Sequence, residues 1–390
     1  MFKKILRFIY FPVSSYIIDN FIPKFNRAIL VAVNSRQDEV DEIMCRFNYF
    51  TQQMPIDVVN LDNLTKIKFL KLAMSFKPIL LLGVEYKLYH MIAINIFNID
   101  YNKCHVDSWS WHRFLYYIDE KKHKEVITSS KKKFIAVVDE LSKLKLDRSY
   151  IFGTGPSLIS ALNYDWSNGF RIVCNTTVKS ERLWNHIKPH FIVAGDAIHH
   201  FSQTQYAKSF RSDLKRRLAS SEVYFIYPLI FDNFIRREFS EFDKYLIAVP
   251  SGYHDKIHVN LCNEFKKPSF ENVLTMLQLP VACTLSKNIF FYGYDGRGKN
   301  DQMFWSSSEE YNYIEHMPEL HQSHPSFFNY YVPKSDPFKY VKKVHGDILE
   351  KLLAKAESLG WKFTLLHISN TETLQKRFKP NILVKKNSDV

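Results

Sequence analysis

Glycine is scarce in this chain of 390 residues: there are 11, so every glycine-containing turn is informative. The five cysteines are scattered and show no Cys-x-x-Cys spacing. This argues against a zinc site or a disulfide framework and suits a reducing cytoplasm. The sequence contains no uninterrupted run of about 20 apolar residues, so it predicts no transmembrane helix.

The first 25 residues are basic and apolar, with charges at Lys3, Lys4 and Arg7 and an interruption at Pro12. No small-residue cleavage site follows them, so a secretory signal peptide fits poorly. Two interpretations stay open. Residues 1–25 form either a basic amphipathic segment on a membrane surface or a helix packed on the domain behind it.

The chain is basic overall, with 53 Lys and Arg against 40 Asp and Glu, and a net charge of +13. This balance favours anionic partners: nucleic acid, acidic lipid, or phosphorylated and carboxylated small molecules. The positive charge is spread along the chain and is not interleaved with an aromatic RNA-binding motif. The sequence therefore predicts no nucleic-acid partner.

Residues 26–145 alternate between apolar runs and amphipathic segments, which predicts a small N-terminal α/β domain. The expected strands are 28–33, 56–61 and 78–84, and the expected helices are 38–50, 64–76 and 90–97. No catalytic constellation is visible here, and the role of this domain stays open. The charge-rich stretch 119–145 predicts a helical connector to the next domain.

The most informative stretch is a strand-like run, Tyr150 to Phe152, that stops at Gly153-Thr154-Gly155-Pro156-Ser157-Leu158. Two glycines permit a sharp turn and a close approach to a ligand, and Pro156 suits the first turn of a helix. A strand, a glycine turn and a helix start together predict a cradle for phosphate. Alone, the same pattern is equally typical of a plain tight turn.

Two further strands also end in polar residues. The run 171–177 ends at Asn175 and Thr176, and the run 189–196 ends at Asp196. Because ligands bind at the carboxyl edge of parallel strands, these side chains are candidate nucleotide contacts. The alternatives are a strand-end turn residue for Asn175 and a helix N-cap for Asp196.

The remaining chain predicts a Rossmann-like parallel sheet flanked by helices. Residues 197–217 predict a solvated basic helix, 269–285 a buried helix capped by Ser269, and 347–359 a helix closed by Gly360. The tract 298–345 is rich in His and Tyr and predicts a lid or binding loop. The other expected strands are 223–227, 245–249, 288–297 and 361–366, and a basic tail spans 371–390.

With these residues placed, the stretch 149–370 resembles bacterial sialyltransferases of the lipooligosaccharide type, the carbohydrate-active family numbered forty-two. It is also similar to the motility accessory factor and hydroxymethylpterin pyrophosphokinase-like family. The resemblance is carried by Gly153 to Leu158, by Cys174-Asn175, and by Phe290 to Asp295 after a buried helix. It implies a variant of the GT-A-like sialyltransferase fold.

The resemblance implies a glycosyltransferase that moves a sialic acid-like sugar from a CMP-activated donor to a bacterial surface glycan or glycolipid. Tyr311 and Tyr313 would stabilise the departing phosphate, and His345 or His324 would be the general base. The family's Thr-Ser-Gly is replaced by Glu271-Asn272-Val273, which puts the donor sugar in doubt. Carried over from the family, the nucleotide contacts would be Gly153, Thr154, Gly155, Ser157 and Asn175. The turns and strand ends add six further candidate contacts: Pro156, Thr176, Asp196, Gly293, Asp295 and Arg297.

No metal or other cofactor is required by that scheme, although Asp295 and Asp301 keep a magnesium site open. The implied location is the cytoplasm, at the inner face of the cytoplasmic membrane. Two other functions stay open: a Mg-dependent pyrophosphokinase-like phosphoryl transfer enzyme, and a non-enzymatic module that binds membrane or nucleic acid.

Overall fold

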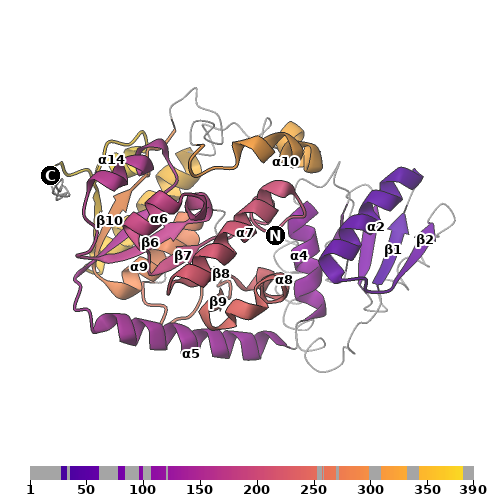
Figure 1. Ribbon diagram of the computed structural model, residues 1–390, viewed down its shortest axis with the longest axis horizontal. Coiled ribbons are helices and arrows are strands. Elements are labelled where there is room, and N and C mark those ends of the chain that lie inside the picture. The colour runs from indigo at the N-terminus through magenta and orange to yellow at the C-terminus, as the bar shows by residue number, and fades with distance from the viewer. Residues whose placement is uncertain are drawn as a thin grey trace, which may run out of the picture. The chain divides into compact units, whose positions relative to one another are not determined.

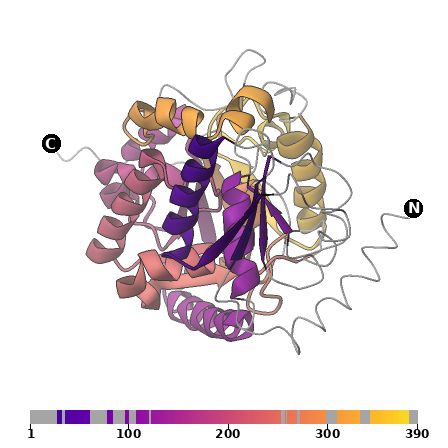
Figure 2. The ribbon, with the colours of Figure 1, turned by 90° about the vertical axis from the view of Figure 1, so that its right-hand side faces the viewer.

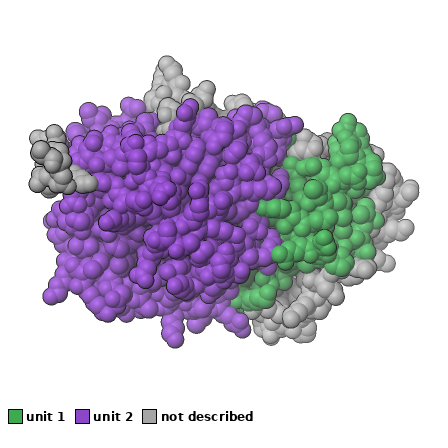
Figure 3. Space-filling view, viewed as in Figure 1, with its two compact units in different colours: residues 1–124, 324–327 green, residues 125–323, 328–390 purple. Residues whose placement is uncertain are grey.

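A computed structural model describes residues 28–32, 36–60, 78–83, 96–99, 107–119, 122–252, 257, 259–268, 272–297, 309–331 and 342–380. The chain divides into two compact units. Unit 1 comprises Met1–Lys124 and His324–Phe327, and unit 2 comprises Glu125–Ser323 and Phe328–Val390 (Figure 3). The N-terminal segment 1–25, the expected helix 64–76, Ser269, Asp301 and the last ten residues of the tail lie outside the described residues.

Unit 1 contains a four-stranded parallel sheet in the order β2-β1-β3-β4. Its strands are β1 (Ala28–Ala32), β2 (Ile56–Asn60), β3 (Ile79–Leu82) and β4 (Ile96–Asn98). The first three strands match the apolar runs of the sequence. Residues 96 and 97 were expected at the end of a helix, but they begin β4, where Ile96 and Phe97 are buried.

Two helices of unit 1, α2 (Gln37–Thr51) and α4 (Asp107–Ile118), contact each other, and α4 also contacts β4 (Figure 2). Their contact is aromatic. The rings of Phe50 and Trp111 stack at 5.7 Å between centroids, and Phe47 meets Phe114 at 6.1 Å. The helix α4, which begins at Asp107, therefore supplies core residues: Trp111 and Phe114 are fully buried.

Unit 2 contains a seven-stranded sheet in which every neighbouring pair is parallel, in the order β11-β10-β5-β6-β7-β8-β9 (Figure 1). This confirms the expected α/β class with a parallel sheet flanked by helices. The strands are β5 (Arg148–Phe152), β6 (Phe170–Cys174), β7 (Phe191–Val193), β8 (Tyr224–Pro228), β9 (Leu246–Val249), β10 (Asn288–Tyr292) and β11 (Lys362–Leu365).

The strand order reverses between β5 and β10. From β5 the chain moves outward strand by strand to β9, and it then returns to place β10 on the other side of β5. Phe152 pairs with Tyr292, so the turns after both strands leave the sheet at the same level. In open parallel sheets such a switch point is where ligands bind.

Helices cover both faces of this sheet. On one face Ile151, Ile172 and Phe291 belong to a core shared with α5 (His123–Ser142), α9 (Leu279–Leu285) and α13 (Leu349–Ser358). On the other face Phe152 and Tyr292 contact Trp166, which follows the 3-10 helix η3 (Pro156–Asn163). Strands buried on both faces explain the continuous apolar runs of the sequence.

The expected connector 119–145 is largely the helix α5, and from Glu125 onward it belongs to unit 2. Phe134 and Val137 enter the sheet core, and the Ser130 hydroxyl accepts a hydrogen bond from Ala248 N–H. Figure 1 shows α5 running along the sheet of unit 2 near β8 and β9. Its charged residues therefore occupy one face of a packed helix.

The tract 298–345, expected as a loop, is largely helical where it is described. It contains α10 (Met317–Ser323), the π-helical turn η9 (Ser326–Tyr331) and the start of η10 (Lys342–Ile348). Residues 197–217 also differ from expectation: a turn precedes α7 (Gln205–Ser220), on which Arg211, Asp213 and Arg217 are buried. Among the described residues, no helix has the length and apolarity needed to cross a membrane.

Candidate functional site

Two turns meet at the switch point of unit 2. Gly153 N–H donates to Tyr292 O at 2.8 Å, and Gly155 N–H donates to Gly293 O at 2.9 Å. A Cβ on Gly155 would lie 2.7 Å from Gly293 O and 2.1 Å from an Asp295 carboxylate oxygen. Glycine is therefore required here because two backbone segments and a carboxylate approach one another closely.

The Asp295 carboxylate occupies the start of η3. It accepts from Ser157 N–H at 3.2 Å and from the Ser157 hydroxyl at 2.9 Å, while Pro156 opens η3 without an N–H. These donors and those of both glycines are thus paired inside the protein. The expected phosphate cradle at the glycine turn is corrected: an internal anion already fills it.

His367, which follows β11, joins the same cluster. Its Nε2 accepts from Tyr294 N–H at 3.0 Å, and its Nδ1–H donates to Ile368 O at 2.8 Å. Burial lowers the pKa of His367, although Ile368 and Asp295 oppose this, so the ring is neutral at neutral pH. Sequence reasoning missed this residue, although its place directly after a strand is the signal that singled out Asn175.

A buried amide ties the two switch-point strands to the helix behind them. Tyr294 OH donates to Gln278 Oε1 at 2.5 Å, and Gln278 Nε2 donates to Phe152 O at 2.9 Å. Gln278 lies in the π-helical turn η7 (Leu274–Gln278) and is fully buried. This relay fixes the ends of β5 and β10, and it too was missed.

Asn175 begins the 3-10 helix η4 (Asn175–Lys179) with a left-handed φ of 49°. Asparagine tolerates this conformation better than other non-glycine residues. Its side-chain oxygen is buried and has no hydrogen-bond partner. Thr176 beside it is buried, and Thr154, between the two glycines, is half-buried. A buried acceptor without a donor is costly, so this oxygen marks a place where a ligand donor fits.

Asp196, beyond β7, shapes a turn with two histidines. Its Oδ1 accepts from Ile198 N–H at 2.8 Å and from His199 Nδ1 at 3.0 Å, and its own N–H donates to His200 Nδ1 at 3.1 Å. Burial would raise the pKa of Asp196, but His199 and His200 outweigh it and hold that pKa below its ordinary value. The carboxylate thus caps a turn and orients an imidazole. It is not the expected helix N-cap, because α7 begins only at Gln205 and is capped by Thr204.

Tyr311 and Tyr313 are both buried, and their hydroxyl protons are used within the protein. Tyr311 OH donates to Gly155 O at 2.8 Å, and Tyr313 OH donates to the buried Asp213 carboxylate. Burial and Asp213 raise the pKa of Tyr313. Tyr311 therefore lies at the glycine turn as expected, but this geometry does not offer either hydroxyl proton to a phosphate.

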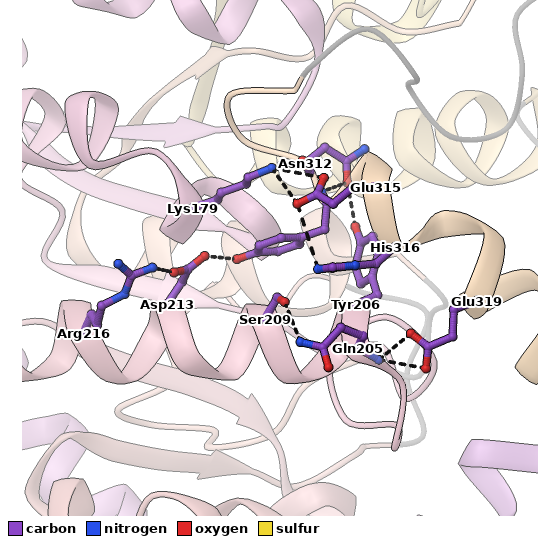
Figure 4. Close-up of polar contacts among 11 residues, drawn as sticks. Lys179, Gln205, Tyr206, Ser209, Asp213, Arg216, Asn312, Glu315, His316 and Glu319 are labelled. Atoms are coloured by element: carbon purple, nitrogen blue, oxygen red, sulfur yellow. Dashed lines mark hydrogen bonds and ion pairs between the residues drawn. The ribbon is translucent and has the colours of Figure 1, made fainter.

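The segment 309–319, which carries Tyr311 and Tyr313 and is called the tyrosine segment below, is fastened to α7 and η4 by several contacts (Figure 4). Lys179 Nζ donates to Asn312 O at 2.6 Å, and Tyr206 OH donates to Asn312 Oδ1 at 2.7 Å. The Glu319 carboxylate accepts from Gln205 N–H at 2.9 Å, at the start of α7. These hydrogen bonds therefore hold the tyrosine segment against the carboxyl edge of the sheet.

His345 accepts a hydrogen bond from the side-chain amide of Asn272, whose orientation is fixed by a second hydrogen bond. Asn272 Oδ1 accepts from Leu274 N–H at 2.9 Å, so Asn272 Nδ2 faces His345 Nδ1, 2.9 Å away, and donates to it. Burial, with Arg297 nearby, lowers the pKa of His345 to about 4. The lone pair on Nδ1 is thus engaged, which disfavours the expected base role at that nitrogen.

His324, the other expected base, lies in unit 1 together with Ser108. Its Nε2 is 2.7 Å from the Ser108 hydroxyl oxygen, and both residues are buried. Proximity in sequence to the tyrosine segment suggested a shared site, but the fold pairs His324 with α4 instead. Elsewhere in the described chain, no group of three or more His, Cys, Asp or Glu side chains is arranged to hold a metal ion.

Comparisons with known proteins identify no family. No protein-family model matches this chain, and no curated protein matches it. Among solved structures, the crystal structure of tagatose-6-phosphate ketose/aldose isomerase from Escherichia coli is 12% identical, covering 71% of this chain and 86% of that chain. Its TM-score is 0.18, which is too low to bear on the function of this chain.

Proposed function

We propose that this protein is a glycosyltransferase that transfers a sialic acid-like sugar from a CMP-activated donor to a surface glycan, on a sialyltransferase-like variant of the α/β fold. The resemblance of 149–370 supports the donor class. The switch point between β5 and β10 supports the position of the site. The basic segment 1–25 would hold the enzyme at the inner face of the membrane, near a lipid-linked acceptor.

The unpaired oxygen of Asn175 carries this proposal. It is an acceptor, so it is matched by a ligand hydroxyl or amine and not by a phosphate oxygen. A nucleoside supplies such donors on its ribose and, in cytosine, on an exocyclic amine. The same holds for Asp295: its carboxylate accepts from Ser157 and retains acceptor capacity for a ribose hydroxyl.

These acceptors orient the donor along the sheet edge. Asp295, Asn175 and Asp196 follow β10, β6 and β7, and β5 lies between the first two. Neighbouring strands are about 4.8 Å apart, so the step from β5 to β7 is roughly 10 Å. A nucleoside held over β10, β5 and β6 would then direct its phosphate and sugar toward β7.

Nucleotide binding tests the proposal. Isothermal titration with CMP, CDP, UDP, GDP and ATP, each with and without Mg²⁺, should show binding of CMP without metal. Asn175→Ala should weaken CMP binding about tenfold, because one hydrogen bond of about 1.4 kcal/mol is lost. Asn48→Ala, on an exposed position of α2, is the matched control and should bind CMP like the wild type.

The other outcomes separate the alternatives. Binding of ATP with Mg²⁺ and not of CMP would favour the pyrophosphokinase-like function. No response to any nucleotide would exclude both enzymes. If wild type and Asn175→Ala bind CMP with equal affinity, the proposed CMP-activated donor stands but Asn175 does not contact it.

A further inference from the structure

An aspartate and a histidine at the end of β7 form a dyad that the resemblance does not assign. Asp196 Oδ1 accepts from His199 Nδ1, 3.0 Å away, and also from two backbone N–H groups of the same turn. Three hydrogen bonds to one oxygen fix the carboxylate, and the carboxylate in turn fixes the imidazole. Such an orienting partner is the second member of acid-base dyads in enzymes.

The partner also decides the tautomer of His199. A carboxylate oxygen only accepts, so the proton of neutral His199 is on Nδ1 and the basic lone pair is on Nε2. The neighbouring His200 has the opposite tautomer when neutral: its Nδ1 accepts from Asp196 N–H, so its proton is on Nε2. Of the two adjacent histidines, His199 thus has the arrangement of a general base held by a carboxylate.

Packing holds the His199 ring in place without covering it completely. Tyr206 meets it edge-on at 5.5 Å and Phe328 lies at 6.3 Å. The side chain keeps 11% of its surface accessible, while the Nε2 atom itself is buried. The dyad follows β7, on the side of the sheet edge toward which the proposed donor directs its sugar. It is therefore placed for the reacting end of the donor.

We infer that His199 is the general base of this enzyme, with Asp196 as its positioning residue. The inference rests on the proposed function. His199 Nε2 takes the proton of the acceptor hydroxyl while the hydroxyl oxygen bonds to the anomeric carbon of the donor sugar. The bond from that carbon to the phosphate oxygen breaks, and CMP leaves with the electron pair. The proton on His199 then passes to solvent.

Other titratable groups surround the dyad, and they limit what a pH profile reports. His200 lies in the same turn, Tyr206 on α7 and His321 on α10. Burial lowers the pKa of His200 to about 3 and raises that of Tyr206. His321 is more exposed, and burial together with His199 lowers its pKa. His321→Gln is therefore needed beside His199→Gln when the acid limb is assigned.

The test measures CMP release from CMP-N-acetylneuraminate, with water as the acceptor and the enzyme-free rate subtracted. His199→Gln should slow turnover about 100- to 10,000-fold, the usual loss for a general base, with unchanged CMP affinity. It should also abolish the acid limb of the kcat profile. Asp196→Asn should reduce kcat less and leave CMP affinity unchanged, because the imidazole remains but loses the carboxylate that fixes its tautomer and orientation.

His186→Gln, on α6 (Glu181–Ile187), is the control and should retain wild-type kcat. Thermal unfolding of each variant excludes a folding defect. If His199→Gln binds CMP and keeps both kcat and its acid limb, the inference is wrong while the proposed function survives. If the wild type neither binds CMP nor releases it from the donor, both are overturned. Removal of the acid limb by His321→Gln instead would assign the base to α10.

Discussion

Asp295 accepts hydrogen bonds from both the N–H and the hydroxyl of Ser157, a residue 138 positions earlier in the chain. The pair joins the turn after β10 to the first turn of η3, across the point where the strand order reverses. An internal carboxylate thus takes the place that a phosphate takes at many helix starts. The site consequently presents acceptors to its ligand, which suits the hydroxyl and amine groups of a nucleoside.

The space at Gly155 gives the first prediction. Gly155→Ala places a Cβ 2.1 Å from the Asp295 carboxylate and 2.7 Å from Gly293 O, so one of the two turns must move. We expect a loss of about 1–3 kcal/mol in unfolding free energy, as for other overpacked sites, and at least tenfold weaker CMP binding. Urea denaturation and titration calorimetry measure the two effects.

Gly346→Ala is the matched control, since no atom lies within 4 Å of its added Cβ and the residue is in the helical turn η10. There alanine should leave stability unchanged or increase it slightly. Equal behaviour of the two variants would contradict the close approach of the turns.

The second prediction concerns the relay from Tyr294 through Gln278 to Phe152. Tyr294→Phe leaves Gln278 Oε1 buried without that donor and should cost about 1–3 kcal/mol. Gln278→Met removes both hydrogen bonds at once. A double-mutant cycle should therefore give a coupling energy above about 0.5 kcal/mol, while strictly additive losses would show that the two side chains do not interact.

The third prediction separates the two proposed roles of Tyr313. If its hydroxyl serves mainly to fasten the tyrosine segment through Asp213, Tyr313→Phe lowers stability by about 1–3 kcal/mol and leaves turnover nearly unchanged. Tyr224→Phe, a half-buried tyrosine on β8, should change stability less. Turnover that falls by about two orders of magnitude at unchanged thermal stability would instead restore the leaving-group role suggested by the resemblance.

Local patterns predicted most of the sheet of unit 2 because buried parallel strands are continuous apolar runs. β5, β6 and β10 each contain the apolar core of such a run, and each ends near the polar residues that marked it. The same strand-end rule located Asn175, Asp196 and Asp295 at one edge. The strand-end rule could not show which side chains at this edge are already hydrogen-bonded within the protein.

The remaining features of the site depend on contacts between residues distant in sequence. The Ser157 hydroxyl donates to Asp295 and the Tyr313 hydroxyl donates to Asp213, and no pattern in the neighbouring sequence predicts either hydrogen bond. The spacing Asp196-x-x-His199 was visible, but the contact between its side chains depends on the turn that precedes α7, where a helix was expected. The tract 298–345 contains few apolar runs, so its helices form mainly through packing, which sequence periodicity does not report.

The last prediction follows from His200, which is buried and accepts from Asp196 N–H. Burial lowers its pKa from 6.5 to about 3, so between these values the unfolded chain binds a proton that the folded chain does not. The stability contributed by neutral His200 is therefore fully present above pH 6.5 and decreases as the pH falls, by about 1.4 kcal/mol per pH unit.

The variant His200→Asn keeps an acceptor for Asp196 N–H but cannot be protonated. Its unfolding free energy, measured by denaturant at pH 7, 6 and 5, should therefore decrease less than that of the wild type. Asp196 adds no pH dependence between pH 7 and 5, because its pKa is lowered and the stability linked to it is lost only below the ordinary aspartate value of 3.8. Parallel pH dependence in wild type and variant would mean that His200 is not held neutral by the fold.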